Sequence, residues 1–122
     1  MAWLYVGSVA AALLAALHSY LGERTVLPAL LGLANLPVVR YDRAFTEAIL
    51  RWAWHLTSIA WLGWAIVLWA LADGSPADRA FVSRIAALVF GVSGVIVVGS
   101  TRGRHVAGPL FAVAALASWF GV

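Results

Sequence analysis

The three histidines of the chain, His18, His55 and His105, are the side chains best suited to carry chemistry. Imidazole nitrogens combined with a carboxylate oxygen are typical ligands of zinc, iron, copper or nickel. Glu23 follows His18 closely in the sequence and supplies such a carboxylate. We therefore expect a transition-metal ion held by the three histidines, with Glu23 as the fourth ligand.

Two charged residues precede His55 at intervals of four residues. Glu47, Arg51 and His55 therefore share one stripe if this segment is helical. We expect Glu47 and Arg51 to contact the ligands or to gate access to them, rather than to bind the ion. A simple salt bridge between Glu47 and Arg51 is the structural alternative.

Haem b is the alternative cofactor. Two histidines from different helices can act as the axial ligands of a haem iron. The porphyrin would then need small neighbours such as Gly22 or Gly63, and nearby arginines would meet its propionates. Three histidines at a similar depth favour a metal ion over haem.

The composition places these residues in a membrane. Hydrophobic residues make up 64% of the 122 residues, charged residues 11%, and the mean hydropathy is +0.95. The chain has no cysteine, which excludes disulfides, thiolate catalysis and iron–sulfur clusters. A net charge of +3 is too small to argue for nucleic acid, so the lipid bilayer is the expected partner.

Four apolar segments approach the roughly 20 residues that a membrane-spanning helix needs. We predict an all-α integral membrane protein, a single domain over residues 1–122 that folds as an antiparallel bundle of four transmembrane helices. A polar helical lead-in from Arg43 should run into the second span. The apolar segment 26–39 is too short to span and is expected to lie along the interface. The predicted spans are 2–22, 52–72, 80–100 and 106–122.

Arginines suggest the orientation. The connections 23–51 and 101–105 hold most of them, so the positive-inside rule places both connections in the cytoplasm and both termini outside, in a bacterial inner membrane. Alternating spans then bring the three histidines into one layer near the cytoplasmic side. Glu23 would end the first helix, where a carboxylate opposes the helix dipole, and this favours a ligand role.

Small residues recur every four positions on the third predicted span. Ser83, Ala87 and Gly91 form a stripe that lets another helix approach closely. We expect the chain to form a homo-oligomer through this stripe.

Two further functions stay open. The length, the helix count and the opening "MAWLYV" are similar to those of small multidrug-resistance exporters, which implies a small transporter. That family needs a carboxylate in the middle of its first helix, and residues 1–22 contain none. A non-catalytic assembly subunit would need only lipid-facing tryptophans and a docking face.

The sequence does not decide whether the chain is an enzyme. Ser19 follows His18 directly and so lies off its helical face, and Ser58 has no evident acid beside it. A pair of nucleophile and base therefore cannot be identified from the sequence.

Overall fold

The computed structural model describes residues 2–103 and 107–121. All regular elements in these ranges are helical, which confirms the all-α class. His105 lies outside the described residues. In chain order the elements are α1 (Ala2–Leu21), the π-helical turn η1 (Gly22–Val26), α2 (Leu27–Leu31), α3 (Arg43–Leu71), α4 (Pro76–Thr101) and α5 (Ala107–Phe120).

The first helix is longer than predicted. α1, η1 and α2 form one continuous helical rod, because the residues that flank η1 keep right-handed helical backbone angles. The wider turn of η1 carries the chain past Glu23 and Arg24, where we expected the helix to end. The dipole argument for Glu23 was therefore wrong, since Glu23 lies inside a helix. The predicted interfacial segment 26–39 divides into helical residues up to Leu31 and a loop.

The second and third predicted spans are confirmed as helices with identifiable starts. The Asp42 side chain accepts a hydrogen bond from Phe45 N at 2.8 Å and caps α3, so the expected lead-in from Arg43 does continue into the span. Ser75 caps α4 in the same way, and Pro76 occupies its first turn.

In the part of the chain that the structure describes, three helices are long and apolar enough to cross a membrane. They cover Ala2–Leu31, Arg43–Leu71 and Pro76–Gly99, and the fourth apolar helix, Ala107–Phe120, has 14 residues. At about 1.5 Å per residue, this last helix is shorter than the roughly 30 Å hydrocarbon core. The length and composition of the helices thus support a small helical membrane protein.

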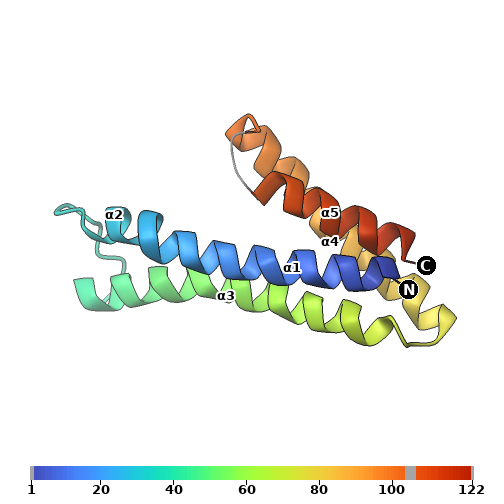
Figure 1. Ribbon diagram of the computed structural model, residues 1–122. Coiled ribbons are helices and arrows are strands. Elements are labelled where there is room, and N and C mark those ends of the chain that lie inside the picture. Colours follow the sequence, from blue (N-terminus) through green and yellow to red (C-terminus); the bar gives the residue numbers. More distant parts are fainter. Residues whose placement is uncertain (1, 104–106, 122) are drawn as a thin grey trace.

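α1 lies at the centre of the packing. It runs antiparallel to α3 on one side and packs against α5 on another, while α4 packs mainly on α5 (Figure 1). The two chain ends lie close together in this view, away from the loop that joins α2 to α3 (Figure 1). The buried core is built from alanines with a few large side chains, including Leu4, Leu14, Leu68, Phe90 and Phe111.

The small-residue stripe of the third span packs inside the chain. Ser83 is fully buried, and only 7% of Ala87 is exposed. A Cβ added at Gly91 would lie 3.9 Å from Ala115 of α5. Ser83 and Ala87 therefore offer little surface to a second copy, so the packing of these residues does not support the expected homo-oligomer contact.

The outer surface is apolar on several helices. Ile59 and Ile66 of α3 and Leu88 and Val95 of α4 are each more than 60% exposed. So much apolar surface is unusual for a protein surrounded by water, and lipid tails are the medium that suits it.

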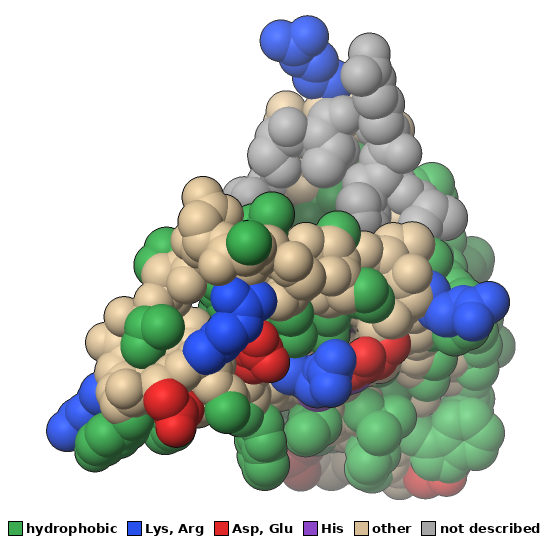
Figure 2. Space-filling view, turned by 90° about the vertical axis from the view of Figure 1, so that its left-hand side faces the viewer, with side chains coloured by type: hydrophobic (Ala, Val, Ile, Leu, Met, Phe, Trp, Pro, Cys, Tyr) green, Lys and Arg blue, Asp and Glu red, His purple; other side chains and the backbone are tan. Residues whose placement is uncertain are grey.

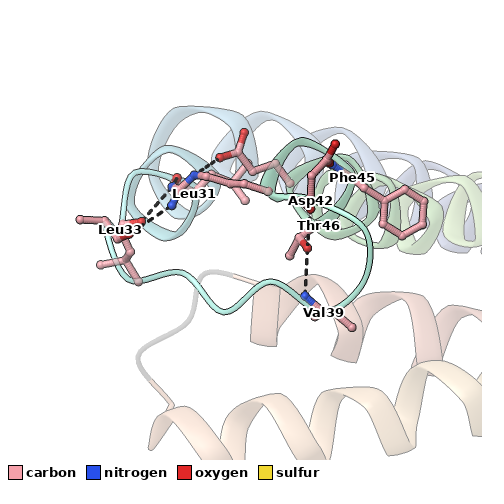
Figure 3. A network of polar contacts seen from close by, with 9 residues as sticks. Leu31, Leu33, Val39, Asp42, Phe45 and Thr46 are labelled. Atoms are coloured by element: carbon pink, nitrogen blue, oxygen red, sulfur yellow. Dashed lines mark hydrogen bonds and ion pairs between the residues drawn. The ribbon is translucent and has the colours of Figure 1, made fainter.

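Arg43 ties the loop between α2 and α3 to the helix ends. Its guanidinium donates to the carbonyl oxygens of Leu31 at 2.6 Å and Leu33 at 2.8 Å, and it pairs with Glu47 at 2.7 Å. The amide of Val39 donates to the Thr46 hydroxyl at 3.1 Å, in the same region (Figure 3). Charged side chains of both signs gather at this end of the molecule (Figure 2).

Candidate functional site

The antiparallel contact of α1 with α3 brings two consecutive pairs of residues together. His18 contacts Trp54, and Ser19 contacts His55. Neighbouring residues on a helix differ by about 100° in direction, so the two pairs lie on different sides of the α1–α3 contact. The prediction that His18 and His55 lie at one level of the bundle is consistent with these contacts, although their depth in a membrane stays a prediction.

His55 is held at both ring nitrogens. Its Nδ1 lies 2.8 Å from the Ser19 hydroxyl, and its Nε2 lies 2.8 Å from Oε1 of Glu23. The Ser19 hydroxyl also lies 2.8 Å from the hydroxyl of Ser58, which is buried. Ser58, Ser19, His55 and Glu23 thus form one chain of hydrogen bonds between the two helices.

Arg51 completes the charged end of this chain. Its Nε lies 3.2 Å from the same Glu23 oxygen that contacts His55. The side chains of Glu23 and Arg51 are about half exposed, at 41% and 51%, whereas that of His55 is 32% exposed. The exposed end of this hydrogen-bonded chain is therefore the ion pair of Glu23 with Arg51, and its other end is the buried hydroxyl of Ser58.

A groove runs beside this network. It has a volume of about 400 Å³, and Ser19, His55 and Ser58 line it together with apolar side chains of α1 and α3. The hydroxyl–imidazole pair therefore faces a space that is open to a small molecule. The apolar lining residues are Ala12, Ala15, Ala16, Ile59 and Leu62.

The structure pairs a hydroxyl with an imidazole that could not be paired from the sequence. Ser19 does lie off the face of His18, but the neighbouring helix brings it to His55. Glu23, which is distant from Ser58 in sequence, is the acid beside that imidazole. The interval of four residues between Ser19 and Glu23 was the available signal, because it places both on one side of a helix.

His18 takes part in a different arrangement. Its Nε2–H donates to the carbonyl oxygen of Trp54 at 3.2 Å, and Trp54 Nε1–H donates to the carbonyl oxygen of His18 at 2.9 Å. The ring of His18 stacks on Trp54 and meets Trp61 edge to face. With this tautomer its Nε2 is a donor and does not act as a metal ligand.

The four predicted metal ligands are only partly brought together. His55 and Glu23 are in contact, His18 makes other contacts, and His105 is outside the described residues. Within residues 2–103 and 107–121, no group of three or more His, Asp or Glu side chains is arranged to hold a metal ion.

Glu47 and Arg51, which we expected to contact the ligands or to gate access to them, have different partners. Glu47 pairs with Arg43, one turn earlier on α3, rather than with Arg51. The predicted four-residue stripe is correct, but the salt bridge between Glu47 and Arg51 is not formed. Arg51 does contact a predicted ligand, Glu23, whereas Glu47 helps to hold the loop.

The fold and the site define a small helical protein with candidate membrane spans and a hydroxyl–imidazole–carboxylate chain between its first two long helices. No family model matches the chain, and no curated protein or solved structure matches it significantly. Its function is therefore argued from the geometry.

Proposed function

We propose that Ser19, His55 and Glu23 form an acid–base centre in which His55 activates the Ser19 hydroxyl toward an amphiphilic ester in the groove. The observation that carries the proposal is that His55 is hydrogen-bonded at both ring nitrogens, to a hydroxyl and to a carboxylate, at 2.8 Å each. A nucleophile, a base and a group that orients the base are the parts that covalent catalysis requires.

The network suits both protonation states of the imidazole. In neutral His55, the Nε2–H donates to Glu23 and Nδ1 accepts the Ser19 proton. In the imidazolium, Nδ1–H donates to Ser19, and Ser19 turns its own proton toward Ser58. Rotation of the hydroxyls therefore keeps the three side chains hydrogen-bonded as the proton moves, which a general base needs.

The proposed reaction is acyl transfer. As the Ser19 oxygen attacks the acyl carbon of an ester, its proton passes to Nδ1 of His55, and Glu23 stabilises the resulting cation. The bond between the acyl carbon and the alcohol oxygen then breaks, and His55 gives its proton to the departing alcohol. Water, activated in turn by His55, hydrolyses the acyl ester on Ser19, which releases the acid and restores the hydroxyl. Ser58, which accepts from Ser19 at 2.8 Å, keeps a hydroxyl proton of its own that can stabilise negative charge on the acyl oxygen of the substrate.

The groove suggests the substrate class. The apolar side chains that line it suit an acyl chain, and the exposed pair of Glu23 and Arg51 lies toward the polar end of the site. If the membrane lies as the arginine distribution predicts, this end faces the cytoplasm and both chain termini lie outside.

An alkyl fluorophosphonate, which reacts with activated serines, tests the proposal. We expect Ser19 to be labelled in the full-length protein in detergent and the label to be absent from Ser19→Ala. His55→Gln should slow the labelling by about 100-fold or more, since a general base typically contributes that much. Mass spectrometry locates the label, and circular dichroism checks that each variant is folded.

Ser8→Ala is the matched control. Ser8 also lies on α1 and bonds across to α3, where it donates to the carbonyl oxygen of Ala65 at 2.7 Å, but it has no imidazole partner. Its replacement should leave the labelling of Ser19 unchanged. Absence of label at Ser19, or equal labelling in His55→Gln, would show that the network only holds α1 to α3.

A transition-metal ion is the second candidate for the same residues. The 2.8 Å contact of His55 with Glu23 places a nitrogen and an oxygen donor close enough to share one ion, and we propose His105 as a further ligand. Arg51 opposes this candidate because its positive charge already neutralises Glu23. Haem b binding, transport and an assembly role do not depend on the chemistry of Ser19. If Ser19 is not labelled, these three functions become the main alternatives to metal binding.

A further inference from the structure

A second hollow lies on the other side of the α1–α3 pair. Its volume is about 410 Å³, and it is lined by residues of α1, η1, α3, α4 and α5. Volumes of about 300–1,000 Å³ are typical of small-molecule sites. This cavity is therefore large enough for a ring with a short alkyl chain.

Aromatic rings form one wall of the cavity. Trp61 meets His18 edge to face at 5.0 Å and Phe111 edge to face at 5.2 Å, measured between ring centroids, and all three residues line the cavity. No Arg, Asp or Glu is present among the described lining residues. Such a wall suits an uncharged molecule that carries a ring.

Two hydroxyls supply the polar character. Thr25 donates to the carbonyl oxygen of Leu21 at 2.6 Å, and Ser93 donates to that of Val89 at 2.7 Å. Each hydroxyl has a single proton, so both protons are already used within their own helices. The hydroxyl oxygens keep acceptor capacity, and an occupant that bonds to them must donate a proton of its own.

We propose that this cavity binds an uncharged, ring-containing amphiphile that carries a hydroxyl group, such as an alkylphenol. The ring lies against Trp61 and Phe111, and the hydroxyl donates to Ser93 or Thr25. This site is separate from the acid–base centre, because the stacked pair of His18 and Trp54 lines the cavity, whereas Ser19 and His55 line the groove. It does not depend on any reaction at Ser19.

Photolabelling in phospholipid vesicles tests the inference. The probe is a 4-alkylphenol with a diazirine in its alkyl chain, and mass spectrometry maps the labelled residues. We expect label around the lining residues, in Leu14–Val26, near Ser93 and Val97, and in Ala107–Phe111. An excess of 4-hexylphenol should remove this label, whereas its methyl ether, which has no hydroxyl proton, should compete about 3- to 10-fold less well, as expected for one neutral hydrogen bond.

Three variants sharpen the test. The double variant Thr25→Ala/Ser93→Ala removes both acceptors and should cancel the advantage of the phenol over its methyl ether. Leu110→Trp fills the cavity and should abolish the label, whereas Leu116→Trp is the matched control, because Leu116 lies on the same helix and is 57% exposed. Circular dichroism verifies the helix content of each variant.

Three results would overturn the inference. Label spread evenly over exposed apolar positions such as Ile66 and Leu88 would show that the probe only dissolves in the bilayer. Equal competition by the methyl ether would show a site for alkyl chains without recognition of a hydroxyl. Label that persists in Leu110→Trp would place the probe outside the cavity.

Discussion

The ring of His18 lies flat against the indole of Trp54, with ring centroids 4.4 Å apart and planes inclined by 3°. Each residue also donates a hydrogen bond to the backbone carbonyl of the other. This reciprocal pair joins α1 to α3 and stands between the groove at Ser19 and the aromatic cavity. Loss of this pair is therefore expected to alter the walls of both proposed sites.

Gly22→Ala should break this pair. A Cβ at position 22 would overlap the indole of Trp54 and come within 2.6 Å of its Cδ1. Because the neighbouring ring is large and hydrogen-bonded, we expect a loss of about 1–3 kcal/mol in the free energy of unfolding, as in overpacked cores. Chemical unfolding in detergent, followed by circular dichroism and tryptophan fluorescence, measures the change.

Gly63→Ala is the control for this substitution. A Cβ at Gly63 would meet no atom within 4 Å, and Gly63 is also inside a helix. Its replacement should be neutral or stabilise by about 0.5–1 kcal/mol through the better helix propensity of alanine. Equal losses in both variants would contradict the close packing of Trp54 on Gly22.

Arg43→Met should release the loop that follows α2. The substitution removes hydrogen bonds to the carbonyls of Leu31 and Leu33 and the ion pair with Glu47. We expect faster amide hydrogen exchange in residues 32–42, with little change in the middle of α1 and α3. Arg40→Met is the control, since Arg40 packs over the Tyr41 ring, and exchange in the loop should then stay as in the parent protein.

The predicted metal site should depend most on His55, Glu23 and His105. Stoichiometric zinc, iron or copper in the purified protein should depend on His55, Glu23 and His105 and be lost in alanine variants of these residues, because too few ligands would remain. His18→Ala should weaken metal binding least, since Nε2 of His18 donates to Trp54 and only Nδ1 could bind the ion. Elemental analysis together with an optical spectrum shows whether the protein binds a metal ion, haem or neither. A Soret band would instead select haem, and a metal-free parent protein would reject both cofactors.

The orientation of the chain in the membrane is a separate prediction. The arginines of 23–51 and 101–105 place both connections in the cytoplasm, so a reporter active only in the cytoplasm should be silent when it is fused after Val122. A fusion within the loop 32–42 should be active. The opposite pattern of reporter activity would show that the protein has the inverted orientation in the membrane. The contacts between its helices do not depend on this orientation.

The sequence by itself determined the helical class, the approximate helices and the common level of His18 and His55 along the α1–α3 pair. Apolar runs of membrane length favour helices because these satisfy every backbone hydrogen bond internally. Alternating directions then align the end of the first helix with the start of the second. The continuation of the first helix through Glu23 was missed, since a charged pair and a later proline normally mark an end.

The tertiary structure alone decided which side chains meet. α1 and α3 are apolar around most of their circumference, so their sequences contain no clear stripe that marks the inner face. A rotation of about 100° separates His18 from Ser19, and the close packing of Trp54 against Gly22 goes with the rotation that brings Ser19 to His55. The common level of His18 and His55 was foreseeable from helix lengths, whereas the hydroxyl–imidazole–carboxylate chain depends on how the two helices are turned toward each other.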